Sequence, residues 1–281
     1  MKAYVSIDME GLPGTAATMT MPWHSQFPEA SRIATAIANA VASALRSHGF
    51  ERVTVADSHG LMTSVSYLDL AEGVELVRGY PRPFSMLTGL DSSYSALLLI
   101  GYHAAAGTPH GFLDHTYSGR AFAEVLINGE RASEFLLNAA YAGELGVPAI
   151  LVAGDAWLTK EVERWAPWAV FVELKRGLSR YSASSPPLGE VRKALEEGVA
   201  EACRRLRDGS ARPLRLATPL ELRIRLREAL VADVLEQLSF VRREGAYDLV
   251  LEARSAREAL GFLEVAAMVA SGVEALRQSV K

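Results

Sequence analysis

The chain lacks most of the features that would identify a secreted, membrane or nucleic-acid-binding protein. It has one cysteine among 281 residues, so it can form neither an intrachain disulfide nor a cysteine-rich metal site. No apolar run approaches the ~20 residues that span a bilayer. The formal net charge is −4, without a basic stripe or an acidic tail, which predicts no nucleic-acid partner. Because the sequence begins with a strand-like segment and not with a signal peptide, we expect a soluble, cytoplasmic protein.

The residues that are present have the proportions of an ordinary globular protein. Hydrophobic residues make up 49% of the chain and charged residues 22%. A length of 281 residues is enough for one large α/β domain, or for a domain with a smaller partner. The single cysteine, Cys203, falls in a helix-like run, where we expect it to act as a small buried hydrophobic residue.

Strand-like and helix-like segments alternate through the first two-thirds of the chain. This rhythm predicts an α/β fold with a mostly parallel open sheet flanked by helices. The predicted strands are Lys2–Asp8, Val53–Asp57, Val74–Val77, Ala96–Gly101, Ala149–Ala153 and Val170–Leu174. The predicted helices between them are Ser31–His48, Glu134–Leu145 and Leu158–Trp165.

Two segments break this pattern and suggest a second unit. Phe122–Ile127 is extended and is followed by Asn128-Gly129, a strong tight-turn signal, so we expect a hairpin insertion near 121–131. After a Ser- and Pro-rich break at 182–187, the chain predicts a smaller α+β unit. Its elements are the helix Leu188–Leu206, the strands Leu220–Leu226 and Ala246–Leu251, and a closing helix Ala256–Leu276. We therefore expect a Rossmann-like α/β domain over 1–185 and a smaller α+β domain over 186–281.

Metal-capable side chains follow three of the predicted strands. Asp8 and Glu10 come at the end of the first strand, His59 follows the second, and His103 follows the fourth. Residues just beyond the carboxyl ends of strands in an open α/β sheet converge on one crevice, so we expect these four side chains to meet. Mixed carboxylate and imidazole ligands suit zinc, manganese or iron better than calcium or magnesium.

Each of these segments also has a simpler explanation. Asp8 and Glu10 could be a solvated strand end, Asp57-Ser58-His59 could cap the next helix, and His103 could be a core histidine paired with a backbone carbonyl. Their conjunction at one edge of the sheet favours shared metal binding.

Three other histidines fit the surface better. His24 and His48 lack such neighbours, and His48 precedes a glycine that is well placed to end a helix. His110 could contact a substrate, but its neighbours Pro109 and Gly111 favour an exposed loop.

Five motifs, in order along the chain, together resemble the D-aminopeptidases encoded with bacterial dipeptide permeases. They are Ser6-Ile7-Asp8-Met9-Glu10-Gly11, Asp57-Ser58-His59, Pro83-Phe84-Ser85-Met86, Gly101-Tyr102-His103-Ala104 and Val152-Ala153-Gly154-Asp155. The resemblance extends to about residue 185 and is weaker beyond it. The sequence departs from the family at Leu113–Tyr117, in the Met19–Ser25 loop and near Ala121–Glu130, which concerns substrate preference more than metal binding.

The resemblance implies a peptidase with two zinc ions that releases N-terminal D-amino acids. It assigns a bridging role to Asp8, one zinc to Glu10 and His59, the other zinc to His103 and Glu134, and the catalytic role to His115. From the residues alone, Glu134 could equally be a first-turn helix carboxylate behind an N-capping Ser133. The family also forms rings, so the resemblance implies a homo-oligomer such as a ring-based decamer.

The sequence therefore predicts a zinc-dependent aminopeptidase for small peptides, with manganese or iron as alternative metals. Two metals would share a hydroxide that attacks the scissile carbonyl. His115 would transfer a proton or act as the nucleophile, and the sequence does not choose between these roles.

Two other classes of function stay open at this point. One is another binuclear-metal amidase or phosphoesterase, for which Arg120 is the nearby cation; the other is a non-enzymatic peptide-binding protein of a transport system.

The closing helix and the region of Trp157, Trp165 and Trp168 offer apolar surface for a homo-oligomer to bury.

Overall fold

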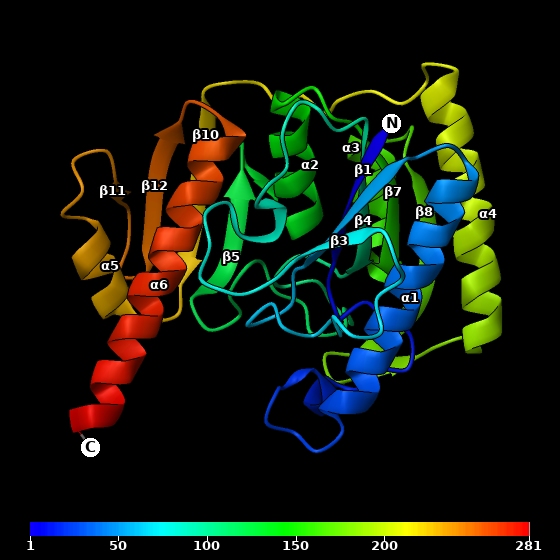
Figure 1. The fold of residues 1–281 in the computed structure, drawn as a ribbon. Helices are drawn as coiled ribbons and strands as arrows, with labels where there is room; N and C mark the ends of the chain where they lie inside the picture. Colours follow the sequence, from blue (N-terminus) through cyan, green and yellow to red (C-terminus); the bar gives the residue numbers. More distant parts are fainter. Residues whose placement is uncertain (281) are drawn as a thin grey trace.

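The computed structural model describes residues 1–280 and contains two sheets that lie beside each other (Figure 1). The larger sheet has seven strands in the order β3-β2-β1-β4-β7-β8-β9, and all but β9 run parallel. The predicted α/β fold with a mostly parallel sheet is thus confirmed. Its strands are β1 Lys2–Ile7, β2 Arg52–Asp57, β3 Val74–Val77, β4 Ala96–Tyr102, β7 Ala149–Asp155, β8 Val170–Ser179 and β9 Ser182–Ser184.

Helices cover both faces of this sheet, because its central strands are apolar on both sides. Helices α1 (Phe27–Ser47) and α4 (Leu188–Arg207) pack together on one face, and α2 (Glu134–Glu144) and α3 (Thr159–Trp165) lie on the other. Along β1, Val5 packs in the core beneath α1 and α4, whereas its neighbour Tyr4 packs in the core on the α2 side. The one cysteine is buried in α4, as expected for a small hydrophobic residue.

The smaller sheet is antiparallel, in the order β11-β12-β10-β5-β6. Its strands are β5 Phe122–Ile127, β6 Glu130–Arg131, β10 Leu220–Leu226, β11 Arg242–Arg243 and β12 Asp248–Ala253. The predicted hairpin is present, and its turn residues Asn128 and Gly129 have φ of 52° and 79°. It is not an isolated insertion, however, because β5 pairs with β10 along its length.

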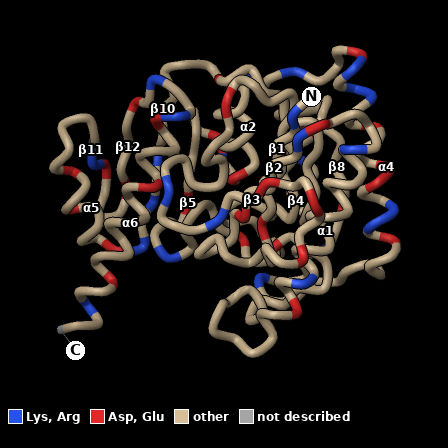
Figure 2. The backbone as a smooth tube through the Cα atoms, viewed as in Figure 1, with Lys and Arg blue, Asp and Glu red and all other residues tan. Residues whose placement is uncertain are grey.

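The two sheets do not coincide with a division of the chain at 185/186. Strand β5 lies before that point but belongs to the five-stranded sheet, and α4 lies after it but covers the seven-stranded sheet. The division into domains 1–185 and 186–281 stays a prediction. Figure 2 shows positive and negative residues interspersed over both parts.

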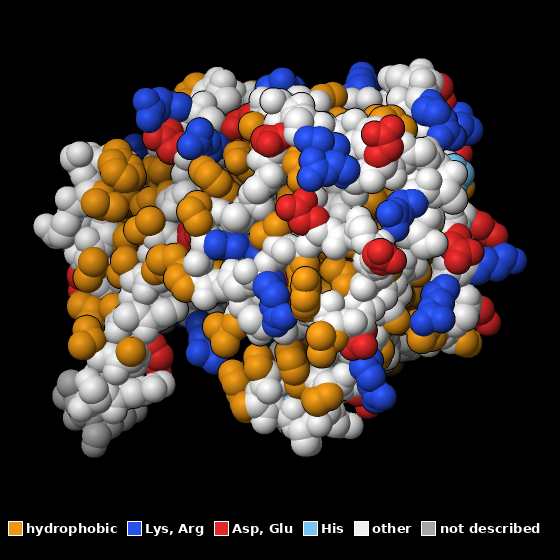
Figure 3. All heavy atoms as spheres, in the orientation of Figure 1, with side chains coloured by type: hydrophobic (Ala, Val, Ile, Leu, Met, Phe, Trp, Pro, Cys, Tyr) orange, Lys and Arg blue, Asp and Glu red, His pale blue; other side chains and the backbone are white. Residues whose placement is uncertain are grey.

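Helices α5 (Ala229–Leu235) and α6 (Ala256–Val280) cover the five-stranded sheet. Hydrophobic side chains gather on this part of the surface (Figure 3), and Val265, Met268 and Leu276 are exposed on α6. Contrary to the expectation from the sequence, α6 is long and apolar enough to cross a membrane by length and composition. This is weak evidence, because a core helix of a soluble protein passes the same test and one face of α6 packs on α2 and the sheet.

The tryptophan region is less exposed than its sequence suggests. Trp157 is 41% exposed, but Trp165 and Trp168 are partly buried against the hydrophobic core. The indole N–H of Trp168 donates to the carbonyl of Ala149. Of these three tryptophans, Trp157 is therefore the one with a largely exposed ring.

Candidate metal centre

Three neighbouring strands of the larger sheet end beside one another, and each supplies a candidate ligand. Asp8 directly follows β1, His59 follows β2 after one intervening serine, and His103 directly follows β4. Because β2, β1 and β4 are adjacent and parallel, their carboxyl ends share one edge of the sheet. Glu134 is the first residue of α2, whose N-cap Ser133 accepts a hydrogen bond from the amide of Leu136.

Two glycines allow the ends of β1 and β4 to touch. Gly101 has φ of +76°, and a Cβ atom there would lie 2.1 Å from the carbonyl oxygen of Asp8. A Cβ atom at Gly11 would lie 2.1 Å from the carbonyl oxygen of Tyr102. With no side chain in the way, the amide of Gly11 donates to the carbonyl of Gly101 at 2.7 Å. This contact brings Asp8 next to His103.

Asp8 lies between two histidines and directs one oxygen toward each. Its Oδ1 is 3.5 Å from Nδ1 of His59, and its Oδ2 is 3.5 Å from Nε2 of His103. Each histidine also faces a second carboxylate: Oε2 of Glu10 is 2.7 Å from His59, and Oε2 of Glu134 is 3.6 Å from His103. The result is one cluster of carboxylates and imidazoles in which Asp8 lies between His59 and His103. Two combinations of residues, His103–His115–Glu134 and Asp8–Glu10–His103, place their ligand atoms within 4.8 Å of one another.

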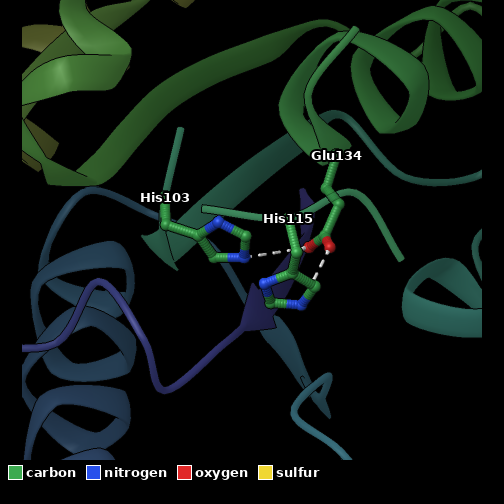
Figure 4. A group of neighbouring side chains, drawn as sticks. All are labelled: His103, His115 and Glu134. Atoms are coloured by element: carbon green, nitrogen blue, oxygen red, sulfur yellow. Dashed lines mark ion pairs between the residues drawn. The ribbon is translucent and has the colours of Figure 1, made fainter. Parts of the chain in front are cut away.

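His115 adjoins His103 and Glu134 (Figure 4). Its ring stacks on that of His103 with a centroid distance of 4.3 Å, and its Nε2 is 3.6 Å from Oε1 of Glu134. The His115 side chain is 21% exposed, whereas that of His103 is 1% exposed. The structure therefore brings together all six residues that the sequence proposed for the site, and His115 is the one most open to solvent.

A backbone carbonyl accepts a hydrogen bond from the outer nitrogen of each histidine. Nε2 of His59 donates to Thr20 at 2.7 Å, Nδ1 of His103 to Ala104 at 3.0 Å, and Nδ1 of His115 to Leu113 at 2.7 Å. In a neutral imidazole the inner nitrogen then carries a lone pair. At His103 that lone pair faces carboxylate oxygens 3.5 and 3.6 Å away, an arrangement that is repulsive unless a cation lies between the atoms. At His59 the contact with Glu10 is short enough, at 2.7 Å, to be a hydrogen bond.

Two buried atoms point to where such cations would bind. Oδ2 of Asp8 and Nε2 of His103 are buried and, within residues 1–280, lack a hydrogen-bond partner. Ligand atoms on one tetrahedral zinc are roughly 3.3–3.6 Å apart, given metal–ligand bonds of about 2.0–2.2 Å. The separations of 3.5 and 3.6 Å around His103 agree with that spacing. The residues fit a divalent transition metal, and His59, His103 and Glu134 have second-layer partners of the kind that orient metal ligands.

The electrostatics without a metal lead to the same conclusion. Burial raises the pKa of Asp8 well above its usual value, and the adjacent Glu10 charge raises it further. Burial would lower the pKa of His59, but the Glu10 and Asp8 charges more than offset this and raise it. Burial and the neighbouring His115 lower the pKa of His103. The metal-free cluster thus takes up protons where metal ions would otherwise compensate its negative charge.

Sequence reasoning missed several residues around the site. The amide of Tyr117 donates to Oε1 of Glu134 at 2.7 Å. The side chain of Lys175 is completely buried, and its Nζ donates to the carbonyl of Glu10. Burial lowers the pKa of this lysine to about 7, against the opposing influence of nearby carboxylates. Lys175 lies close to Glu173 and next to Arg176 in its strand, so nothing local marks it as buried, and nothing local marks Tyr117 or the carbonyl of Thr20.

The remaining candidates, His110 and Arg120, are exposed. His110 is exposed and packs near Trp157 with ring centroids 5.7 Å apart, so the prediction of a surface position is confirmed. Within the described part of the chain, no arginine or lysine forms an ion pair with Asp8, Glu10 or Glu134.

An open α/β sheet that carries two adjoining carboxylate–imidazole groups is the arrangement of a metal-dependent hydrolase. The chain belongs to the D-aminopeptidase family, whose model matches residues 1–265. The predicted family and type of enzyme, a metallo-aminopeptidase, are confirmed.

Individual relatives agree in sequence and in structure. A D-aminopeptidase of Bacillus subtilis (strain 168) is 33% identical over 205 residues, which cover 72% of this chain and 73% of that protein. The solved structure described as the Zn-dependent D-aminopeptidase DppA from Bacillus subtilis, a self-compartmentalizing protease, matches with a TM-score of 0.90. It is 28% identical and the match covers 96% of this chain and 98% of that one.

Proposed function

We propose that the chain is a zinc-dependent aminopeptidase that removes D-configured N-terminal residues from small peptides, with two zinc ions per chain. The observation that carries this proposal is Asp8, whose two oxygens each face the inner nitrogen of a different histidine. One carboxylate in that position is suited to bridge two metals. The solved relative is described as Zn-dependent, which supports zinc over manganese or iron.

The ligand assignment follows the contacts around Asp8. Glu10 and His59 would hold one zinc, because both lie on the Oδ1 side of Asp8 and, without metal, are joined by a hydrogen bond of 2.7 Å that a metal would replace. His103 and Glu134 would hold the other, because they face each other across 3.6 Å on the far side of Asp8. The hydrogen bond from the amide of Tyr117 leaves Oε2 of Glu134 free to bind metal.

Two zinc ions would supply Lewis acidity and lower the pKa of a shared water toward ~7. The protein's part is to orient groups and to move protons. The bond from Nδ1 of His115 to Leu113 leaves its Nε2 as an acceptor, the state that both a general base and a nucleophile require. Its exposure is greater than that of the proposed ligands, which supports a role in contact with substrate.

Metal content tests the assignment. Elemental analysis of the purified protein should give about two zinc ions per chain. Asp8→Ala should lose both ions. Glu10→Ala or His59→Ala should weaken mainly one site, and His103→Ala or Glu134→Ala mainly the other. Asp91→Ala, at an exposed carboxylate far from the cluster, should leave the metal content unchanged. Full occupancy in Asp8→Ala would overturn the proposed bridge.

Substrate comparison tests the activity. We expect faster cleavage of D-alanyl than of L-alanyl amides and dipeptides, because a site that fixes the amine, the carbonyl and the attacking oxygen sends the side chains of the two enantiomers in opposite directions. An acetylated amine should block cleavage. Equal or higher kcat/KM for L-substrates would contradict the stereochemical part alone, and cleavage of acetylated substrates would favour the binuclear-metal amidase alternative.

We also propose a large homo-oligomer, such as a ring-based decamer, in the cytoplasm. The solved relative is described as self-compartmentalizing. The exposed apolar side chains Val265, Met268 and Leu276 on α6, together with Trp157, offer surface to bury between copies. Light scattering at micromolar concentration should give a mass several times that of the chain, and a monomer would rule the oligomer out.

A further inference from the structure

Lys175 lies in β8 and places a charged group in the interior without an acidic partner. Its side chain is 0% exposed. Among the described residues, no carboxylate lies within ion-pairing distance of its Nζ. Burying a charge in this way is costly unless hydrogen bonds satisfy it. The contacts that satisfy it therefore indicate what the residue does.

All three N–H groups of the ammonium are used on one loop, the segment 9–15 that follows β1. Nζ donates to the carbonyl of Glu10 at 2.8 Å, to the carbonyl of Thr15 at 2.8 Å and to Oγ1 of Thr15 at 2.7 Å. The Thr15 hydroxyl in turn donates to the carbonyl of Leu12 at 2.8 Å. The loop thus closes on itself around the ammonium, and the backbone of Glu10 is fixed at its centre.

A second contact links Lys175 to the other side of the site. Nζ lies 3.9 Å from the centre of the Phe112 ring, a cation–π contact. The amide of Phe112 donates to Oδ2 of Asp155 at the end of β7. The ammonium therefore lies between the loop that carries Glu10 and the Phe112 ring, whose backbone is hydrogen-bonded to the end of β7.

We propose that Lys175 is a positioning residue that sets the affinity of the Glu10–His59 zinc site. This inference rests on the two-zinc proposal. The peptide group between Glu10 and Gly11 is held on its N–H side by Gly101 and on its carbonyl side by Lys175, while the Glu10 carboxylate reaches His59 at 2.7 Å. Loss of the lysine would release the carbonyl side and let that ligand shift. Asp8 does not depend on it, because the Asp8 amide is fixed by the carbonyl of Ile100. Among the described residues, neither His103 nor Glu134 is hydrogen-bonded to the ammonium of Lys175, so the zinc affinity of their site should be unchanged.

Stepwise zinc affinities, measured by competition with a chromogenic chelator, test this selectivity. Lys175→Met should weaken one of the two ions by about 10–100-fold, the range for lost outer-layer partners, and the other by less than about threefold. Lys160→Met, at an exposed lysine, is the matched control and should change neither. Adding Lys175→Met to His59→Ala should not weaken the one remaining ion further.

A milder variant and a stability measurement separate positioning from general destabilisation. Thr15→Val keeps the lysine and removes one acceptor, so it should weaken the same ion by about 2–10-fold, the value of a single hydrogen bond. Equal loss of both ions, or unchanged affinities in folded Lys175→Met or Thr15→Val, would overturn the proposal. A wild-type protein that binds no zinc would instead refute the proposed function.

Discussion

Replacing Asp8 with asparagine should stabilise the metal-free protein and at the same time abolish its response to zinc. Asparagine keeps the shape of the side chain and removes its charge. In the structure, Oδ2 of Asp8 is buried without a partner and faces the lone pair on Nε2 of His103 at 3.5 Å. An amide N–H in that position would donate to His103, and Glu10 would no longer face a second buried carboxylate.

The size of the effect follows from these contacts. An unsatisfied buried polar group costs about 1–3 kcal/mol. For a chain of this size about 1 kcal/mol corresponds to roughly 2–4 °C in Tm, so metal-free Asp8→Asn should melt roughly 2–12 °C above the metal-free wild type. Zinc at about 1,000 times its Kd stabilises by about 4 kcal/mol per site, so the wild type should then overtake the variant.

The difference between the metal-free proteins should also depend on pH. The folded-state pKa of Asp8 is raised by burial and by Glu10, so folding favours the protonated acid. The stability that this proton contributes is present below the ordinary pKa of an aspartate and is lost as pH rises through the raised value. Asparagine does not titrate, and its advantage over the wild type should grow with pH.

Calorimetric melts in chelator and in excess zinc, at several pH values, provide the measurement. Asp91→Asn is the control, because that carboxylate is exposed and remote. A metal-free Asp8→Asn protein that melts below the wild type would refute the reasoning about the orphaned oxygen. An undiminished zinc response in the variant would refute the bridging role.

Three further outcomes follow from the structure. His115→Ala should keep its zinc, but its kcat should fall by about a hundredfold or more. A near-normal kcat with zinc bound would show that His115 has no catalytic role. Gly101→Ala should unfold at a clearly lower urea concentration than Gly89→Ala. Both glycines have positive φ, but a Cβ at Gly101 would lie 2.1 Å from the carbonyl oxygen of Asp8, whereas a Cβ at Gly89 would meet nothing within 4 Å. Equal midpoints would contradict the close approach of β1 and β4. Burial raises the pKa of Glu161 to about 7, so folding favours its protonated form, and the stability that this proton contributes is lost as pH rises from about 4.5 through 7. Glu161→Gln should therefore make the urea midpoint fall less steeply over that pH range. An unchanged pH profile of the midpoint would refute this prediction.

Much of the fold and the candidate site could be predicted because the signals are local. Apolar runs that end in Asp8, His59 or His103 identify parallel strands and their carboxyl ends, and the topology of an α/β sheet then brings those ends together. Glu134 and His115 required the family resemblance, since a carboxylate that starts a helix and a histidine in a loop are ordinary local features.

The remainder depends on contacts between segments that no local pattern encodes. The histidine orientations depend on carbonyls of Thr20, Ala104 and Leu113. The burial of Lys175 depends on a loop that begins far earlier in the chain. Likewise, the composition of β5 identifies a strand but not its partner, so its pairing with β10 could not be anticipated.

The pairing of β5 with β10 has a consequence for how the protein acquires its structure during synthesis. The segments that bear Asp8, Glu10, His59 and His103 belong to strands that can associate early, since β1, β2 and β4 are complete before β5 emerges. His115 and Glu134 flank β5. One edge of that strand pairs with the short strand β6, and the other edge stays unpaired until β10 leaves the ribosome. A nascent chain would therefore assemble one half of its metal centre first and the half with His115 and Glu134 only after β10 has emerged, so that peptidase activity would not arise before that strand is made.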